Sequence, residues 1–140
     1  GIATFWLAAH YFKKKLQYIG FGGTGRQLRD FLHIDDLLEL LLVQMKNPEA
    51  FSQCVYNVGG GYGNSASLLE LTEICVAITG NSVEISANPE TRYADIPVYI
   101  SDCAKITAQC GWKPAAPVHK IIEDIHKWLG STPAIQGLFD

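Results

Sequence analysis

Two short patterns in the sequence have the residue types and spacing needed to hold a dinucleotide and to move a proton. Residues 20–25 spell GFGGTG, which satisfies the GxGxxG pattern of a dinucleotide-binding loop. Tyr11 and Lys15 stand four residues apart, so on a helix both side chains lie on one face, where the ammonium group could lower the pKa of the phenol. Each pattern carries chemistry only in the right structural setting.

The setting of both patterns argues against that chemistry. A dinucleotide loop needs a helix that opens at its third glycine and points its N-terminus at the pyrophosphate. Here RQLRDFLHI follows Gly25 and predicts a strand, so we interpret residues 20–25 as a connection at which the backbone approaches a ligand. Tyr11 and Lys15 have no serine partner or cofactor site, and Lys15 ends a run of three lysines typical of a solvated helix end, so we interpret their spacing as chance.

Composition narrows the class of protein. With 140 residues, 48% of them hydrophobic, the chain can fold around one core as a single domain, residues 1–140. Eleven basic and 14 acidic residues give a formal charge of −3 spread along the chain, which argues against binding to nucleic acid or to an anionic membrane. The longest apolar stretch, residues 37–43, is far below the ~20 residues of a membrane span.

The four cysteines indicate neither a metal centre nor a disulfide framework. They form no CxxC pair, and no histidine stands at zinc-finger spacing from them. We therefore expect reduced thiols, a cytoplasmic protein and no bound metal. The chain opens at Gly1 without methionine, directly into an apolar run, and we expect it to begin at a boundary inside a longer protein.

The order of predicted elements is that of an α/β fold. Periodicity predicts helices over residues 2–15, 37–45, 68–79 and 118–129, and short strands over residues 16–21, 27–34, 55–58, 83–86 and 99–101. Asp35 and Asp36 are expected to cap the second helix, Ser67 with Glu70 forms a capping box for the third, and Gly80 stands where the C-terminal cap of the third belongs. The second helix is apolar on nearly all faces, which predicts burial on more than one side. Because few strands are long apolar runs, we expect the main sheet to lie elsewhere in the parent protein.

Three separated segments jointly resemble one protein family. GTGRQLRDFLHIDD, residues 23–36, resembles the segment of extended short-chain dehydrogenases that runs through an R-D-x-x-H/Y-V-x-D motif into a helix. YNVGGG followed by NSASLLEL, within residues 56–71, is similar to the strand, glycine turn and helix that come next in that family. ETRYADIPVYISDCAKITAQCGWKP, residues 90–114, is similar to its R-x-x-D segment with the downstream D-x-x-K and G-W-x-P. The chain thus resembles the NAD-dependent epimerase/dehydratase family, and the residues of these motifs are most like those of the CDP-paratose 2-epimerase (CDP-tyvelose epimerase) branch.

The resemblance implies that this chain is the C-terminal, substrate-binding part of an isomerase of carbohydrate metabolism that acts on nucleotide sugars. In that family, tightly bound NAD reversibly oxidises a sugar hydroxyl and returns the hydride to the other face, while the protein orients the sugar. The Rossmann half, with its NAD site and its catalytic serine, tyrosine and lysine, is then absent. We therefore expect no catalytic residue and no bound cofactor in this chain, which alone should be inactive.

The resemblance also assigns substrate-binding roles. Arginines at the positions of Arg29 and Arg92 bind the diphosphate in that family, which suits guanidinium groups because they pair with phosphate oxygens. Asp95 is expected to contact the ribose hydroxyls. Gln27 is a candidate contact to the sugar or the phosphate, and Phe21 a candidate to pack on the nucleobase.

Each assignment has a structural alternative. Arg29 could instead form a salt bridge with Asp30 or Asp35, Arg92 could be a surface residue, and Gln27 could face solvent from a strand. Tyr18 is a second candidate for the base contact, although an aromatic residue on a short strand is more often part of the core. His33 is expected to orient the Arg29 segment rather than to act as an acid or base.

Other functions stay open on the sequence alone. UDP-glucose 4-epimerases and nucleotide-sugar dehydratases share the same framework of motifs, so the base and the sugar are not fixed. A stand-alone nucleotide-binding or interaction module, or a catalytically dead relative, is the alternative from another class. Without its partner half the chain would expose apolar surface, and we expect it to self-associate.

Overall fold

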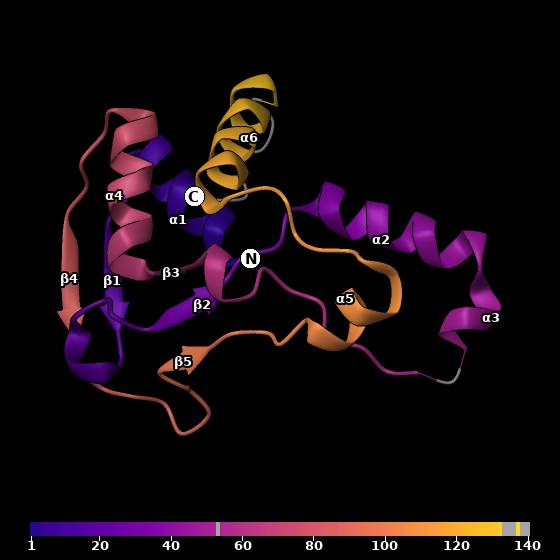
Figure 1. Ribbon diagram of the computed structural model, residues 1–140. Helices are drawn as coiled ribbons and strands as arrows, with labels where there is room; N and C mark the ends of the chain where they lie inside the picture. The colour runs from indigo at the N-terminus through magenta and orange to yellow at the C-terminus, as the bar shows by residue number, and fades with distance from the viewer. Residues whose placement is uncertain (53, 133–136, 138–140) are drawn as a thin grey trace.

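Helices and short strands alternate along the computed structural model (Figure 1), which describes residues 1–52, 54–132 and 137. The helices are α1 Ile2–Tyr11, α2 Ile34–Lys46, α3 Pro48–Phe51, α4 Leu68–Thr79, α5 Ala104–Cys110 and α6 Val118–Ser131. The strands are β1 Leu16–Ile19, β2 Leu28–Asp30, β3 Ser65–Ser67, β4 Ile85–Asn88 and β5 Val98–Tyr99, with 3-10 turns at Phe21–Gly23 and Tyr62–Asn64. The α/β class predicted from the sequence is confirmed.

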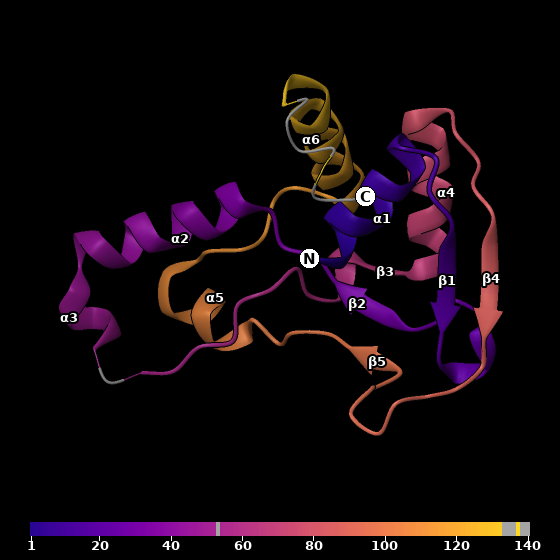
Figure 2. The ribbon, with the colours of Figure 1, turned by 180° about the vertical axis from the view of Figure 1, so that it is seen from behind.

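The main hydrophobic core lies where α1, α4 and α6 pack together, with β1 alongside (Figure 2). Leu7, Leu71 and Ile122, one from each of these helices, have no exposed surface there. The core also includes Trp6, whose indole Nε1 donates a hydrogen bond to Thr72 Oγ1 at 2.8 Å. Helices far apart in the sequence thus form one packed layer.

The strands form two small sheets rather than one large one. β1 pairs in parallel with β4, joining Leu16 to Ile85. β2 lies between β3, its antiparallel neighbour, and β5, its parallel neighbour. The two strands that flank the glycine-rich turn therefore belong to different sheets, and this turn carries the chain from one sheet to the other.

Local capping signals in the sequence correspond to real helix ends. The Ser67 hydroxyl accepts a hydrogen bond from the Glu70 backbone N–H, and the Glu70 carboxylate accepts from the Ser67 backbone N–H, so the predicted capping box begins α4. Gly80 ends the same helix in the left-handed conformation, as predicted. The first helix is shorter than predicted, because the chain turns at Lys13, whose φ is +55°.

Two predictions about α2 are wrong. Its N-cap is His33, whose Nδ1 accepts a hydrogen bond from the Asp35 backbone N–H at 3.0 Å, because the helix begins at Ile34, ahead of the two aspartates. Burial is also limited to one side. Leu40 packs with Ile106 and Trp112 in a second, smaller cluster, while most of the other apolar side chains of α2 are exposed.

No strand forms at residues 55–58, where the sequence predicted one. A strand needs a neighbour to receive its backbone hydrogen bonds, and within the described part of the chain no strand runs beside this segment. Val55 is accordingly 84% exposed. Figures 1 and 2 show this segment leading from α3 past α5, on the side of the molecule away from β1 and β4.

Candidate functional site

A cavity of about 500 Å³ lies between α1, β1, β2 and the segment that precedes β5. All five residues to which the sequence assigned substrate-binding roles line it: Phe21, Gln27, Arg29, Arg92 and Asp95. They come from segments up to 74 positions apart, and the fold brings them together around one space. This convergence makes the cavity the candidate functional site.

Arg29 is held at the wall of this cavity by backbone carbonyls. Its Nη2 donates to the Ile96 oxygen at 2.8 Å, and its Nη1 donates to the Leu28 oxygen at 2.7 Å and more weakly to the Pro97 oxygen at 3.5 Å. Among the described residues no carboxylate pairs with it, so the salt bridge to Asp30 or Asp35 is not formed. A guanidinium group bound only to neutral oxygens keeps its positive charge available for an anion.

Arg92 and Asp95 lie on the loop that enters β5. Both are exposed, and the loop turns tightly between them because the Asp95 backbone N–H donates to the Arg92 oxygen at 3.0 Å. The Arg92 side chain forms no hydrogen bond or ion pair with any other residue that the structure describes. One cation and one carboxylate are thus displayed at the mouth of the cavity.

Phe21 lines the cavity from the glycine-rich turn, and Gln27 lines it from the residue just before β2. The Gln27 amide Nε2 donates to the Ile19 oxygen at 2.8 Å, which fixes the side chain against β1. Phe21 adopts a φ of +49°, the left-handed region that residues other than glycine seldom occupy. Such strain persists where the surrounding structure imposes it, and it is frequent at functional sites.

Tyr18 does not reach the cavity. Its ring stacks on Trp6 with the centroids 5.7 Å apart, and its hydroxyl forms a 2.8 Å hydrogen bond with Thr72 Oγ1. Gly25 faces the same ring so closely that a Cβ atom there would lie 2.7 Å from it. Of the two aromatic candidates for a base contact, only Phe21 lines the cavity. Tyr18 packs against the core instead, as the structural alternative for this residue predicted.

The other polar residues of the segment after Arg29 hold the fold together. The Asp30 carboxylate accepts from the backbone N–H groups of Gly61, at 3.0 Å, and Ser101, at 3.1 Å. The His33 Nε2 lies 3.2 Å from the Asp124 carboxylate of α6, which ties the start of α2 to that helix. Both ring nitrogens of His33 are therefore engaged, as expected for a residue that orients its segment rather than for a catalytic base.

Asp124 itself is surrounded by hydrogen-bond donors. Lys120, one turn earlier on α6, donates to its carboxylate, and Lys127 and His33 also contact it. These hydrogen bonds, the one from Lys120 above all, lower the pKa of Asp124 to about 2. The carboxylate therefore stays ionised across the neutral range and anchors His33.

Sequence reasoning missed the apolar wall of the cavity. Ile2, Phe5 and Trp6 line it from α1, and Gln17 and Ile19 from β1. Phe5 is 53% exposed there. The available signal was an apolar stripe at positions 2, 5 and 6, but a stripe of this kind does not distinguish a core face from a cavity wall.

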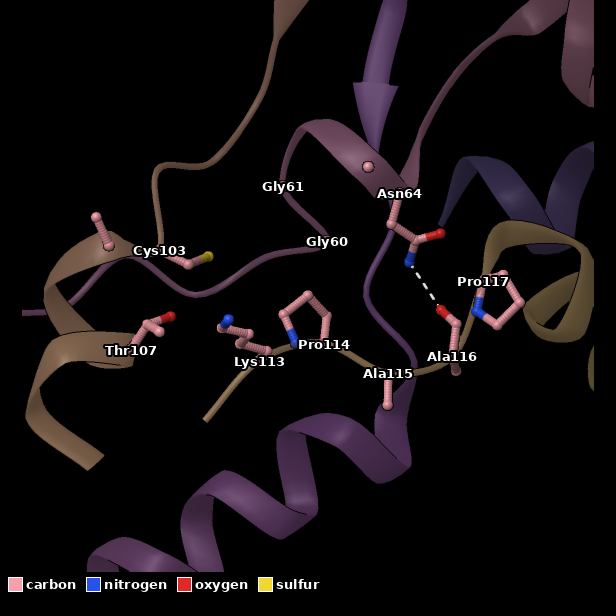
Figure 3. A pocket seen from close by; sticks show the side chains of 12 residues that line it. Gly60, Gly61, Asn64, Cys103, Thr107, Lys113, Pro114, Ala115, Ala116 and Pro117 are labelled. Atoms are coloured by element: carbon pink, nitrogen blue, oxygen red, sulfur yellow. Dashed lines mark hydrogen bonds between the residues drawn. The ribbon is translucent and has the colours of Figure 1, made fainter. Parts of the chain in front are cut away.

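A second cavity, of about 430 Å³, lies between the glycine turn at residues 59–64, α5 and residues 113–117 (Figure 3). Figure 3 shows the Asn64 amide pointing to the Ala116 carbonyl, to which its Nδ2 donates at 2.9 Å. The backbone N–H groups of Ala115 and Ala116 are taken by the Asp36 carboxylate, at 3.1 and 3.0 Å. The polar groups of this cavity thus join two parts of the fold, whereas the first cavity also displays Arg92, whose side chain has no hydrogen-bond or ion-pair partner among the described residues.

The glycine-rich turn does not fit a dinucleotide. A short strand, β2, follows Gly25 where a pyrophosphate site needs a helix N-terminus, so the strand predicted after this motif is confirmed. Lys15 lies outside α1 and pairs with Glu84 at 2.7 Å, so it no longer shares a helix face with Tyr11. In the part of the chain that the structure describes, no cluster of three metal-binding side chains occurs. No described helix is long and apolar enough to cross a membrane.

Comparisons of sequence and of structure both match this chain to epimerases. A model of the NAD dependent epimerase/dehydratase family matches residues 3–59. The chain is 29% identical to a CDP-paratose 2-epimerase from Salmonella typhi over 109 residues, which cover 78% of this chain and 32% of that enzyme. It is also 29% identical to a UDP-glucose 4-epimerase from Corynebacterium glutamicum, over 71% of this chain and 30% of that enzyme.

The fold agrees with these similarities. A UDP-glucose 4-epimerase from Thermotoga maritima, solved with UDP-glucose, superposes with a TM-score of 0.75 at 20% identity, over 95% of this chain and 40% of that one. The chain thus spans about a third of the length of the curated relatives that it matches. Its α/β fold is similar to that of the Thermotoga maritima epimerase, and residues 3–59 match the NAD dependent epimerase/dehydratase family.

Proposed function

We propose that the cavity beside Arg29 binds the nucleoside diphosphate part of a nucleotide sugar, and that a CDP-sugar is the natural ligand. The observation that carries the proposal is the Arg29 guanidinium, fixed at the cavity wall by carbonyl oxygens and without a carboxylate partner in the described chain. A diphosphate is a dianion, and two arginines at one cavity offer it matched charge and paired hydrogen bonds. The similarity to a CDP-paratose 2-epimerase supports cytidine as the nucleoside.

The other residues of the cavity suit the remaining parts of such a ligand. Asp95 would accept hydrogen bonds from the ribose hydroxyls, since a carboxylate is an acceptor only. Phe21 would pack on the face of the base. Gln27, fixed by its bond to Ile19, would contact the sugar or the phosphate.

The matching test is calorimetric titration of the 140-residue chain with CDP, UDP and CMP. In Arg29→Ala and in Arg92→Ala we expect Kd for CDP to rise about tenfold or more, because a hydrogen bond to a charged group is worth about 1.5–3 kcal/mol. Arg26→Ala is the control, since Arg26 is exposed on the same segment but does not line the cavity. CMP should bind more weakly than CDP, because it lacks one phosphate.

The outcomes separate the alternatives. Equal affinities in wild type and both arginine variants would remove the diphosphate site. Tighter binding of UDP than of CDP would favour a UDP-sugar enzyme, in line with the UDP-glucose 4-epimerase similarity, and would refute the choice of cytidine. Absence of binding by either nucleotide would leave a non-catalytic interaction module as the better explanation.

We also propose that residues 1–140 act as the substrate-binding domain of a larger NAD-dependent epimerase. The relatives are about three times as long as the matched part, and the glycine-rich turn here does not fit a dinucleotide. NAD and the catalytic groups would then belong to another part of the enzyme, and this chain alone would be inactive. Incubation with NAD and a CDP-sugar, followed by chromatography for the epimer, should give no product.

An exposed apolar stripe on α2 supports this view of a domain that needs a partner. Ile34, Leu38, Leu41, Leu42 and Met45 are 45–75% exposed and recur at helical spacing along one side of the helix. Exposed patches of this kind usually mark contacts with other protein surfaces. In the larger enzyme the stripe would pack on the cofactor-binding part, and without that part we expect two copies of this chain to associate through it.

Sedimentation velocity checks this expectation. Wild type should show association that depends on concentration, and Leu38→Lys with Leu41→Lys should sediment as a monomer. Leu69→Lys is the control, because Leu69 is similarly exposed but lies on α4, away from the stripe. A monodisperse wild-type monomer, with α2 well protected from hydrogen exchange, would contradict the role of the stripe.

A further inference from the structure

Within the loop that enters β5, residues 91–96 are tied to the rest of the molecule by hydrogen bonds at two points, one on each side of Arg92 and Asp95. On the N-terminal side, the Phe21 backbone N–H donates to Thr91 Oγ1 at 2.8 Å. On the C-terminal side, Arg29 donates to the Ile96 carbonyl at 2.8 Å. The residues between these ties are exposed, so the ties are what hold Arg92 and Asp95 at the cavity.

The Thr91 tie acts on the most strained part of the site. Phe21 has a φ of +49°, and a residue with a Cβ atom stays in this region only when its neighbours hold it there. Gly20, just before it, is itself tied by its backbone N–H to the Asn88 oxygen at 2.8 Å. Two successive residues of the turn are therefore held, Gly20 by the end of β4 and Phe21 by the loop, and Thr91 supplies the only side chain in those two links.

We propose that Thr91 is a positioning residue of the nucleotide site. Its hydroxyl oxygen holds Phe21 in the left-handed conformation and, one residue along the chain, seats Arg92 at the mouth of the cavity. This inference rests on the proposed function, because Phe21 and Arg92 are assigned there to the base and the diphosphate. If Phe21 and Arg92 are already ordered in the free chain, less conformational entropy is lost when the ligand binds. A residue that does not touch the ligand can raise affinity in this way.

The test compares three variants of the 140-residue chain. Thr91→Val keeps the shape of the side chain but removes the acceptor, and Thr91→Ser restores the hydroxyl. Thr79→Val is the matched control: Thr79 Oγ1 also accepts from a backbone N–H, that of Asn81 at 3.2 Å, but outside the cavity. Any general effect of losing such a bond should appear in the control as well.

The first measurement uses no ligand. Amide hydrogen exchange followed by NMR should be several times faster at Phe21 in Thr91→Val than in wild type, and Thr91→Ser should restore the wild-type rate. The Arg92 amide should also show greater mobility in its ¹⁵N relaxation. Unchanged exchange at Phe21 in Thr91→Val would overturn the proposal, whatever happens with nucleotides.

The second measurement is calorimetric titration with CDP and UDP. We expect Thr91→Val to weaken binding about five- to tenfold, because Arg92 and Phe21 must then be ordered on binding. The midpoint of urea unfolding should stay close to that of wild type, which distinguishes positioning from general stability. Wild-type affinity in Thr91→Val would refute the positioning role. If neither nucleotide binds wild type, the proposed nucleotide site fails, while exchange at Phe21 still decides whether Thr91 holds the turn.

Discussion

Replacing Gly60 by alanine is expected to destabilise the chain strongly, although the change adds a single methyl group. A Cβ atom at this position would lie 2.0 Å from the Phe31 carbonyl oxygen, 2.7 Å from its carbonyl carbon and 2.9 Å from its nitrogen. Real Cβ atoms do not approach backbone atoms so closely. Gly60 is buried, so the methyl group has no open space into which it could move.

The neighbouring backbone cannot give way without losing bonds. Phe31 donates its N–H to the Asn64 oxygen at 2.9 Å, and its carbonyl accepts from Asn64 Nδ2 at 2.6 Å. Overpacking a well-packed site costs about 1–3 kcal/mol and occasionally more. Because the clash here is with backbone, we expect the Gly60→Ala loss in unfolding free energy to be at the top of that range, about 3 kcal/mol.

Urea unfolding followed by circular dichroism measures this loss, and Gly63→Ala is the matched control. A Cβ atom at Gly63 would meet nothing within 4 Å, and Gly63 lies in the same glycine turn. Its free energy of unfolding should change by no more than about 0.5 kcal/mol. Equal stability of Gly60→Ala and Gly63→Ala, at equal m-values, would refute the reasoning from close approach.

Three further predictions concern the capping box and the buried thiol. Ser67→Ala should lower the free energy of unfolding by about 1 kcal/mol in urea titrations at pH 7, because α4 loses its N-cap. Hydrogen bonds from the Ser67 N–H and hydroxyl lower the pKa of Glu70 below its ordinary 4.5. The stability that the Glu70 carboxylate contributes is therefore complete above pH 4.5 and is lost as pH falls through the folded-state pKa. Glu70→Gln should flatten this acid decline in stability, and an unchanged decline would contradict the role of the carboxylate. Burial raises the pKa of the Cys75 thiol to about 12, so little reactive thiolate forms there at pH 8. Iodoacetamide at pH 8, followed by mass spectrometry, should therefore label exposed Cys54 in the native chain and Cys75 only after unfolding. Labelling of Cys75 in the native chain would contradict its burial.

The candidate site was predictable only in part. Arg29, Arg92 and Asp95 were found through a resemblance of motifs, and the structure brings them to one cavity with Phe21 and Gln27. The wall that α1 contributes was missed because an apolar helical stripe looks the same whether it faces a core or a cavity. The left-handed Phe21 and its tie to Thr91 left no mark in the sequence, since the two residues are 70 positions apart.

By itself, the sequence determined the features that form within a few residues. The capping box of Ser67 and Glu70 and the left-handed Gly80 were predicted correctly, because each depends on backbone groups about one helical turn away. Only the tertiary structure decided which strand pairs with which, that residues 55–58 have no strand partner among the described residues, and that α2 leaves an apolar stripe exposed. The reason is that pairing and burial depend on groups brought together from distant parts of the chain, or from outside it, which local patterns cannot specify.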